Sequence, residues 1–540
     1  MVKIPCQARF VVVLLAFSLI GFAPPVAAQI VVGAPAAPPQ TSTTPPTPDV
    51  KAFTDANKIV EPDKKIEALE KFVRDFPESP RKTQAYDVLF NTLVKSFPQD
   101  RTRILEYGDE VIESTPEGFR SSGYSRVATR LVDAGILLDD AARLAEKGLA
   151  VFEAEEKTRT DRSRATHLAT LGRIRVKQGR AADGEETLKA AFAANPDMTS
   201  AAVGLAELAE TRKDLQGALE LWTTAALTGR LSVEDRQRFE TLYAKVNGSA
   251  DGIEAMLDAK YRATRVPPVH PQPYTPTSAR SNRLVLGEIF TGASCGPCVS
   301  VDLAFDAAME RYTRSDLAVV MYHMHIPGPD PLTNKSTEER AKFYTVRGVP
   351  TFAVDGTVDP RGGGDRAATK GAYDRILPQV DKALEAAADA DLRLDATLTD
   401  GVVRVKALPS NMKPEGGAIK LQIALVEEMM TYSGENGVRF HPMVVRSLAG
   451  ENSEGIAVDR AAPAPIQWEF DLAKTSAAIK AYLDDYEQNG PRGKVTFVRK
   501  PSTIGATNLS VVAFLQDAQS KKVLQAAYIK LSPATTSSSR

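Results

Sequence analysis

Apolar residues recur every three or four positions through the first half of this chain. In residues 51–262 this spacing, seen for example at Ile66 and Leu69, is that of helices with one apolar face. The pattern also repeats: the turns at Gly179 and Lys213 lie 34 residues apart, between similar orders of small and large residues. We therefore predict an all-α region of repeated helix pairs.

The second half of the chain changes to the patterns of sheets. Residues 283–390 alternate between buried apolar runs and amphipathic runs, which predicts an α/β domain. Its strands are expected at 284–290, 317–323 and 351–356, and its helices at 299–312, 336–344 and 370–387. Residues 391–532 hold short alternating runs between turn-forming residues, which predicts a β-sandwich. Its strands are expected at 392–398, 402–408, 419–426, 466–472, 495–499, 509–515 and 523–531, with a helix inserted at 475–487.

The two ends of the chain and two proline-rich stretches set the remaining boundaries. Residues 1–28 begin with basic residues, continue with an apolar run and end in small residues, which predicts a signal peptide cleaved before Gln29. Residues 29–50 and 263–282 are rich in proline and predict linkers. The serine-rich residues 533–540 predict a disordered tail. We therefore expect an exported, multidomain protein.

Charge and cysteine content narrow the function. The formal net charge is −1, so no basic excess favours nucleic acid as a partner. Of the three cysteines, Cys6 lies in the predicted signal peptide, which leaves Cys295 and Cys298 for the mature chain. A pair this close in sequence restrains little of the unfolded chain, so we predict a redox role rather than a structural one.

The run Cys295-Gly296-Pro297-Cys298 lies between a predicted strand and a predicted helix. A thiol at the first turn of a helix faces unpaired N–H groups and the positive end of the helix dipole, which favours the reactive thiolate. Pro297 suits this turn because its missing N–H is not needed there. The two cysteines are therefore predicted to interconvert between dithiol and disulfide.

This run, followed later by Val349-Pro350, resembles thioredoxin over residues 283–390. The resemblance implies that Cys295 is the exposed attacking thiol and that Cys298 is the more buried resolving thiol. It also implies a cis Pro350 opposite the cysteines, with Val349 beside it for pairing with a substrate strand. The redox group would be the disulfide itself, so no cofactor is expected.

Three further residues are candidate modulators of the thiols: Glu288, Ser294 and Pro297. Ser294 stands where thioredoxin usually has a tryptophan, which removes an aromatic contact surface. The buried acid of thioredoxin would fall at Ile289, next to Glu288. A shifted strand could bring Glu288 to the cysteines, but alternation along the strand favours a solvated carboxylate.

Two histidines near the end of a predicted strand allow another chemistry. His323 and His325 lie on one face of the strand end and could join the cysteines as zinc ligands. Polar histidines at a loop edge are the favoured interpretation, so no metal is expected.

Two more resemblances bear on partners and location. The 34-residue period resembles tetratricopeptide repeats, which stack into a concave surface that binds peptides or proteins, although a helical spacer without a ligand fits as well. The Phe290-Thr291-Gly292 loop and residues 432–437 resemble a thioredoxin-fold family of exported, outer-membrane-associated proteins. That family implies a location in the periplasm or at the outer membrane of the cell envelope.

Two functional hypotheses follow. The first is a thiol–disulfide oxidoreductase that forms a mixed disulfide with protein substrates through Cys295, more in keeping with a reductase, which would need a membrane electron donor. The second is an envelope scaffold that binds partners through the repeats and the β-domain, with the thioredoxin fold as a platform.

Overall fold

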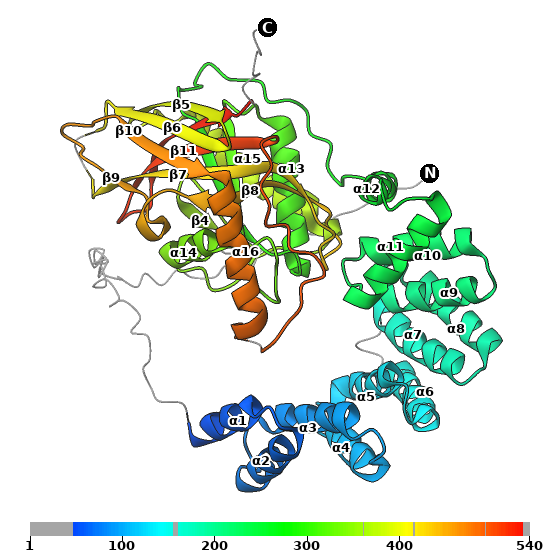
Figure 1. The fold of residues 1–540 in the computed structure, drawn as a ribbon. Helices are drawn as coiled ribbons and strands as arrows, with labels where there is room; N and C mark the ends of the chain where they lie inside the picture. The colour runs from blue at the N-terminus through cyan, green and yellow to red at the C-terminus, as the bar shows by residue number, and fades with distance from the viewer. Residues whose placement is uncertain (1–46, 155–159, 360, 414–415, 492, 533–540) are drawn as a thin grey trace, which may run out of the picture. The chain divides into compact units, whose positions relative to one another are not determined.

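The computed structural model describes residues 47–154, 160–359, 361–413, 416–491 and 493–532 (Figure 1). The chain forms two compact units, residues 1–81 and 82–540. The predicted signal peptide, residues 29–46 of the first predicted linker and the predicted tail lie outside the described residues. Within the described ranges, no helix combines the length and the apolar composition needed to cross a membrane.

The described residues of the first unit, 47–81, form two helices, α1 (Pro48–Lys58) and α2 (Pro62–Asp75). Each begins with a proline, which the first turn tolerates because that turn's N–H groups have no partner within the helix. The rings of Phe53 and Phe72 pack with centroids 5.6 Å apart. Because α1 starts at Pro48, the predicted boundary at residue 50 is wrong by a few residues.

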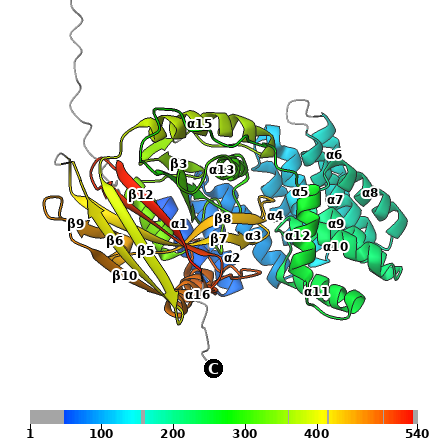
Figure 2. The same cartoon turned by 90° about the horizontal axis from the view of Figure 1, so that it is seen from above.

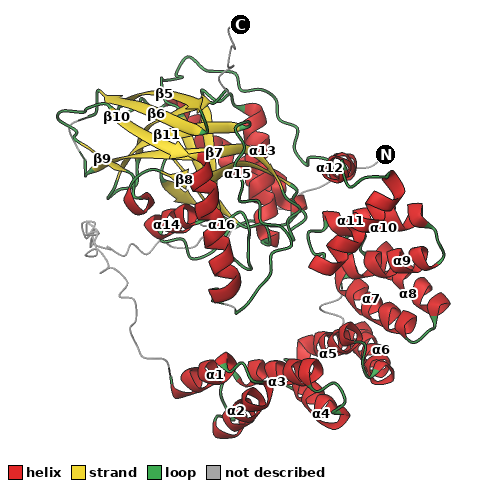
Figure 3. Cartoon of the chain, in the orientation of Figure 1, coloured by secondary structure: helices red, strands yellow, loops and turns green. Residues whose placement is uncertain are grey.

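The second unit begins with ten helices, which lie in consecutive pairs (Figures 1 and 3). They are α3 (Lys82–Ser96), α4 (Arg101–Glu113), α5 (Arg120–Ala134), α6 (Leu138–Ala154), α7 (Asp161–Lys177), α8 (Ala181–Ala194), α9 (Thr199–Thr211), α10 (Leu215–Leu227), α11 (Val233–Asn247) and α12 (Ile253–Thr264). Within one pair, a Cβ on Gly184 of α8 would lie 2.9 Å from the carbonyl oxygen of Gly172 on α7, so the pair needs glycine to approach this closely. The predicted helical repeat region is confirmed.

After these helices, the strands of this unit form two sheets. The larger sheet has the order β12-β11-β7-β8-β2-β1-β3-β4, with β9 paired to β7, and the smaller has the order β10-β6-β5. The strands are β1 (Val285–Thr291), β2 (Leu317–His323), β3 (Thr351–Val354), β4 (Thr357–Asp359), β5 (Asp391–Thr399), β6 (Val402–Ser410), β7 (Ile419–Thr431), β8 (Phe440–Leu448), β9 (Ile456–Val458), β10 (Ile466–Asp471), β11 (Leu509–Asp517) and β12 (Val523–Lys530). The helices are α13 (Val299–Arg311), α14 (Lys335–Tyr344), α15 (Thr369–Glu385) and α16 (Leu472–Asn489).

The larger sheet crosses the predicted domain boundary at residue 390. Strand β8 lies between β7 and β2, and it joins β2 in parallel where Met321 pairs with Val444. The smaller sheet packs over β7 and β11 through an apolar core that includes Val405, Leu421 and Leu515, and Figure 2 shows its strands apart from α13 and α15. The prediction of an independent β-sandwich is therefore wrong. Two sheets do face each other, but the larger one continues into the α/β region. The strand expected at 495–499 is absent from the described residues there.

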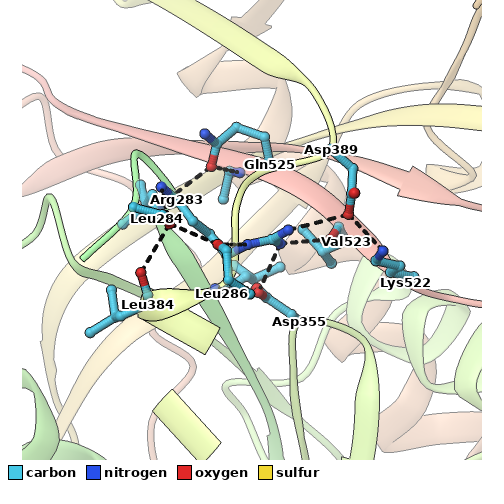
Figure 4. Close-up of polar contacts among 12 residues, drawn as sticks. Arg283, Leu284, Leu286, Asp355, Leu384, Asp389, Lys522, Val523 and Gln525 are labelled. Atoms are coloured by element: carbon cyan, nitrogen blue, oxygen red, sulfur yellow. Dashed lines mark hydrogen bonds and ion pairs between the residues drawn. The ribbon is translucent and has the colours of Figure 1, made fainter. Parts of the chain in front are cut away.

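Arg283 shows how tightly the α/β region is joined to the strands after residue 390 (Figure 4). Its guanidinium donates to the carbonyl of Val523 on β12 and pairs with Asp355 and Asp389, all at 3.1–3.2 Å. The second predicted linker is packed as well, because the Tyr274 N–H donates to a carbonyl at the end of α13 at 2.8 Å. Residues 263–282 are therefore not a free spacer.

Candidate functional site

The two cysteines lie where β1 passes into α13, and they are joined in a disulfide. A 3₁₀ turn at Gly296–Cys298 precedes the helix, with Pro297 exposed in its first positions. The backbone N–H of Cys298 donates to the sulfur of Cys295 at 3.1 Å. A sulfur so placed faces the N-terminal N–H groups of a helix, which stabilise negative charge on it.

Val349 and Pro350 lie against the disulfide. Their peptide bond is cis, and the Val349 carbonyl oxygen lies 3.7 Å from the sulfur of Cys295. Because both sulfurs are in the disulfide and carry no hydrogen, this is a packing contact rather than a hydrogen bond. Gly363 lies close to both prolines: a Cβ there would lie 2.1 Å from the Pro297 carbonyl oxygen and 2.8 Å from Pro350, so only glycine fits.

Both sulfurs are covered. The exposed fraction of Cys295 is 1% and that of Cys298 is 0%. The expectation of an exposed Cys295 is therefore wrong for this conformation. The turn between β7 and β8, residues 432–438, which we call the cap segment, lies against the chain that leads into Cys295. Its Asn436 donates from the backbone to the Ala293 carbonyl at 3.0 Å and from its side chain to the Gly292 carbonyl at 3.2 Å.

Arg439, which directly follows the cap segment, ties it to the helical repeats. This side chain is fully buried, and its guanidinium pairs with Glu254 and Asp258 of α12, both at 2.7 Å, and donates to Ser433 at 2.8 Å. Burial of Glu254 would raise its pKa, but a hydrogen bond from Arg439, together with other nearby arginines, outweighs burial and lowers the pKa to about 2. Glu254 therefore stays charged.

The loop between α10 and α11 also lies against the cap segment. A Cβ on Gly229 would lie 2.4 Å from the carbonyl oxygen of Ser433. Two elements of the repeats thus contact the chain at the cap segment, which in turn bonds to the residues before the disulfide.

Buried acids lie around the chain that enters the disulfide. Asp330 accepts hydrogen bonds from the Ala293 N–H at 2.6 Å and from His323 Nδ1 at 2.8 Å. Asp302, one turn after Cys298, accepts a hydrogen bond from Thr291 at 2.8 Å, and burial raises its pKa to about 7. Sequence reasoning missed both acids, although Asp302 could have been found because it stands four residues after Cys298 on the same helix face.

The histidines singled out from the sequence do not surround the cysteines. His323 bonds to Asp330, and His325 accepts from the Asp330 N–H at 2.9 Å while stacking on Tyr486 at 3.6 Å between ring centroids. Among the described residues, no group of three His, Cys, Asp or Glu side chains is arranged to hold a metal ion.

Glu288 is buried rather than solvated, so the favoured expectation for it was wrong. Its exposed fraction is 0%, and its carboxylate pairs with Arg340 of α14 at 2.7 Å and accepts a hydrogen bond from Tyr322 at 3.0 Å. Arg340 in turn donates to Gln516 of β11 at 2.7 Å. Glu288 thus stabilises the joint between β1, α14 and β11. Ser294 Oγ has no hydrogen-bond partner among the described residues.

The fold and the site define a helical-repeat protein joined to a mixed sheet that carries a covered disulfide at the start of a helix. No protein-family model matches the chain, and no curated protein matches it.

Among solved structures, HBP35 of Porphyromonas gingivalis is similar over 48% of this chain and 80% of its own, with 16% identity and a TM-score of 0.35. TTC0263, a thermophilic TPR protein in Thermus thermophilus, is similar over 36% and 97%, with 19% identity and a TM-score of 0.26. Pseudomonas aeruginosa pilF is similar over 40% and 88%, with 16% identity and a TM-score of 0.26. TM-scores this low carry no conclusion about function.

Proposed function

We propose that this protein binds protein partners through its helical repeats. The observation that carries the proposal is a groove of about 520 Å³ between α5 and α7. Phe119 stands at this groove with an exposed fraction of 61% and gives it an apolar edge. The disulfide, by contrast, is closed to partners in this conformation.

The lining of the groove indicates the chemistry of the partner. Arg130 brings positive charge, whereas Arg126 is paired with Asp87 at 3.6 Å. Hydroxyl groups come from Ser122, Ser163 and Thr166. Arg130 is exposed and forms no ion pair with any described residue. Guanidinium groups bind carboxylates in a bidentate fashion, so the groove suits a peptide with an acidic residue close to an apolar one.

Reversing the charge of Arg130 tests this proposal. The full chain is used to probe an array of peptides that pair Asp or Glu with Leu or Phe. Arg130→Glu is expected to weaken binding to the peptides retained by the unmodified chain by about tenfold or more, because it places like charges together. Lys245→Glu, an equal charge change at an exposed position of α11, is the matched control. If both variants bind the peptides as well as the unmodified chain does, the groove is not the peptide-binding site.

We propose thiol–disulfide exchange as a second function, because the disulfide lies at the N-terminus of α13 beside the Val349 carbonyl. In the reduced protein, the Cys295 thiolate would attack a disulfide of a partner and displace one partner thiolate. Cys298 would then attack the mixed disulfide, releasing the reduced partner and re-forming Cys295–Cys298. Each cycle consumes two electrons, which a membrane-bound dithiol donor would restore.

The resemblance to thioredoxin supports this second function, and the predicted signal peptide supports a location in the periplasm or at the outer membrane. Both functions fit a single exported protein in which the repeats select the partner.

Replacing Cys298 by alanine tests the exchange. Without the resolving thiol, Cys295 is expected to remain joined to a disulfide-bonded probe such as insulin, as a higher-mass species that dithiothreitol removes. Electrophoresis without reductant measures it, and Cys295→Ser/Cys298→Ala is the control. If Cys295 reacts with a maleimide but forms no such species, the chain is a binding protein alone.

A further inference from the structure

We propose that the cap segment, residues 432–438, is a built-in gate on the Cys295–Cys298 disulfide, and that helix α12 holds this gate closed. The proposal rests on the thiol–disulfide exchange proposed above and adds its regulation.

Access to the sulfur is the first step of the argument. A thiolate must approach a disulfide sulfur directly for exchange to occur, so the reaction depends on access. With Cys295 only 1% exposed, no such approach is open. The side chain of Asn436 also bonds to the carbonyl of Cys295 itself, at 3.4 Å. Some of the chain packed around Cys295, which includes the cap segment and the Val349 carbonyl at 3.7 Å from the sulfur, must therefore move before either sulfur can react.

The second step concerns what keeps the cap segment in place. It is a short turn with internal hydrogen bonds from the Gly434 N–H to the Val438 carbonyl at 2.8 Å and from the Val438 N–H to Asn436 Oδ1 at 3.0 Å. Arg439, the residue after the cap segment, attaches it to α12 through ion pairs with Glu254 and Asp258. We call these three residues the latch.

The latch is also connected to the neighbouring helix of the repeats. Glu254 also pairs with Arg236 of α11 and with Arg499, both at 2.7 Å, so the carboxylate is shared among three arginines. Its side chain is about one-third exposed, at 34%, whereas Arg439 is fully buried. A partner that draws Glu254 or Asp258 away would leave Arg439 without its counter-charges, which favours opening. Binding on α11 and α12 would thus open the disulfide in the sheet.

The test measures how fast dithiothreitol reduces the oxidised full chain under native conditions. One dithiothreitol thiolate attacks a sulfur, the Cys295–Cys298 bond breaks and the other cysteine leaves as a thiolate. The second thiol then releases oxidised dithiothreitol and the protein dithiol. Samples are quenched with acid, and the free thiols are labelled with a mass-tagged maleimide.

Glu254→Gln/Asp258→Asn removes both charges of the latch while keeping side-chain shape. We expect it to raise the reduction rate by about tenfold or more, because a smaller opening free energy exposes the disulfide more often. Glu185→Gln/Glu207→Gln is the matched control: both carboxylates pair with arginines within the repeats, and neither touches Arg439. Should the latch variant not fold, Asn436→Ala, which removes only side-chain hydrogen bonds, is expected to raise the rate several-fold.

Two outcomes would overturn the gate: a folded chain that is reduced as fast as the chain in denaturant, or variants that leave the rate unchanged. Insulin reduction separates failure of the gate from failure of the exchange itself. Faster reduction by dithiothreitol without electron transfer to insulin would support the gate and contradict the exchange. Insulin reduction at one rate in all variants would support the exchange and contradict the gate.

Discussion

Replacing Arg340 by methionine is expected to lower the free energy of unfolding by about 3–5 kcal/mol. The change leaves the Glu288 carboxylate inside the sheet without its counter-charge, because Glu288 has no exposed surface. Taking one partner from a buried ion pair is costly, since a charge must then remain out of water alone. Equilibrium unfolding of the full chain in urea measures the loss.

Two controls separate this effect from a general cost of losing an arginine. Arg238→Met breaks ion pairs with Glu207 and Glu210, in which Arg238 is 41% exposed and its partners are 43% and 23% exposed, and it should cost less than about 1 kcal/mol because these pairs remain in contact with water. Glu288→Gln/Arg340→Met removes both charges and should recover part of the loss. If Arg340→Met costs no more than Arg238→Met, Glu288 is not isolated from water.

Acid is expected to destabilise the chain through His441. Burial, together with the nearby His323, lowers the pKa of His441 to about 3, from an ordinary value of 6.5. Below pH 6.5 the unfolded chain therefore binds a proton that the folded chain does not, so stability falls as the pH falls. The loss grows by about 1.4 kcal/mol per pH unit and reaches about 2 kcal/mol at pH 5.

The measurement compares urea unfolding at pH 7 and pH 5 for the unmodified chain and for His441→Asn. The comparison is needed because burial raises the pKa of Asp302 to about 7, and that carboxyl acts in the opposite direction, favouring the folded chain as the pH falls. His441→Asn should lose about 2 kcal/mol less than the unmodified chain on acidification. His270→Asn, at an exposed position, is the control. Equal losses in His441→Asn and the unmodified chain would show that His441 takes up its proton without unfolding.

The helices were predictable because their signals are local. The spacing of apolar residues and the turns at Gly179 and Lys213 recur within each helix pair, and both turn residues adopt the left-handed conformation expected there. The strand–turn–helix around the cysteines was predictable for the same reason.

Strand β8 was missed because its own residues argue against a strand. It contains Pro442, which cannot donate a ladder hydrogen bond, and Arg446, a charged residue that is buried beside Glu427 at 3.3 Å. Without β8, nothing in the sequence connects the strands before residue 390 to those after it, so a separate sandwich seemed the simpler solution. Glu288 was misplaced for a different reason: alternation assumes that one face of the strand meets water, whereas all the residues of β1 are buried, so both of its faces are covered.

Periodicity and helix-start chemistry act over a few neighbouring residues, so the order of helices, most strands and the position of the cysteine pair could be read from the chain alone. Burial of Cys295 could not, because the chain packed around it includes Val349 and Asn436, which lie far along the sequence and come close to Cys295 only in the folded chain. Access to a sulfur is a property of what packs over it, and only the folded chain decides that.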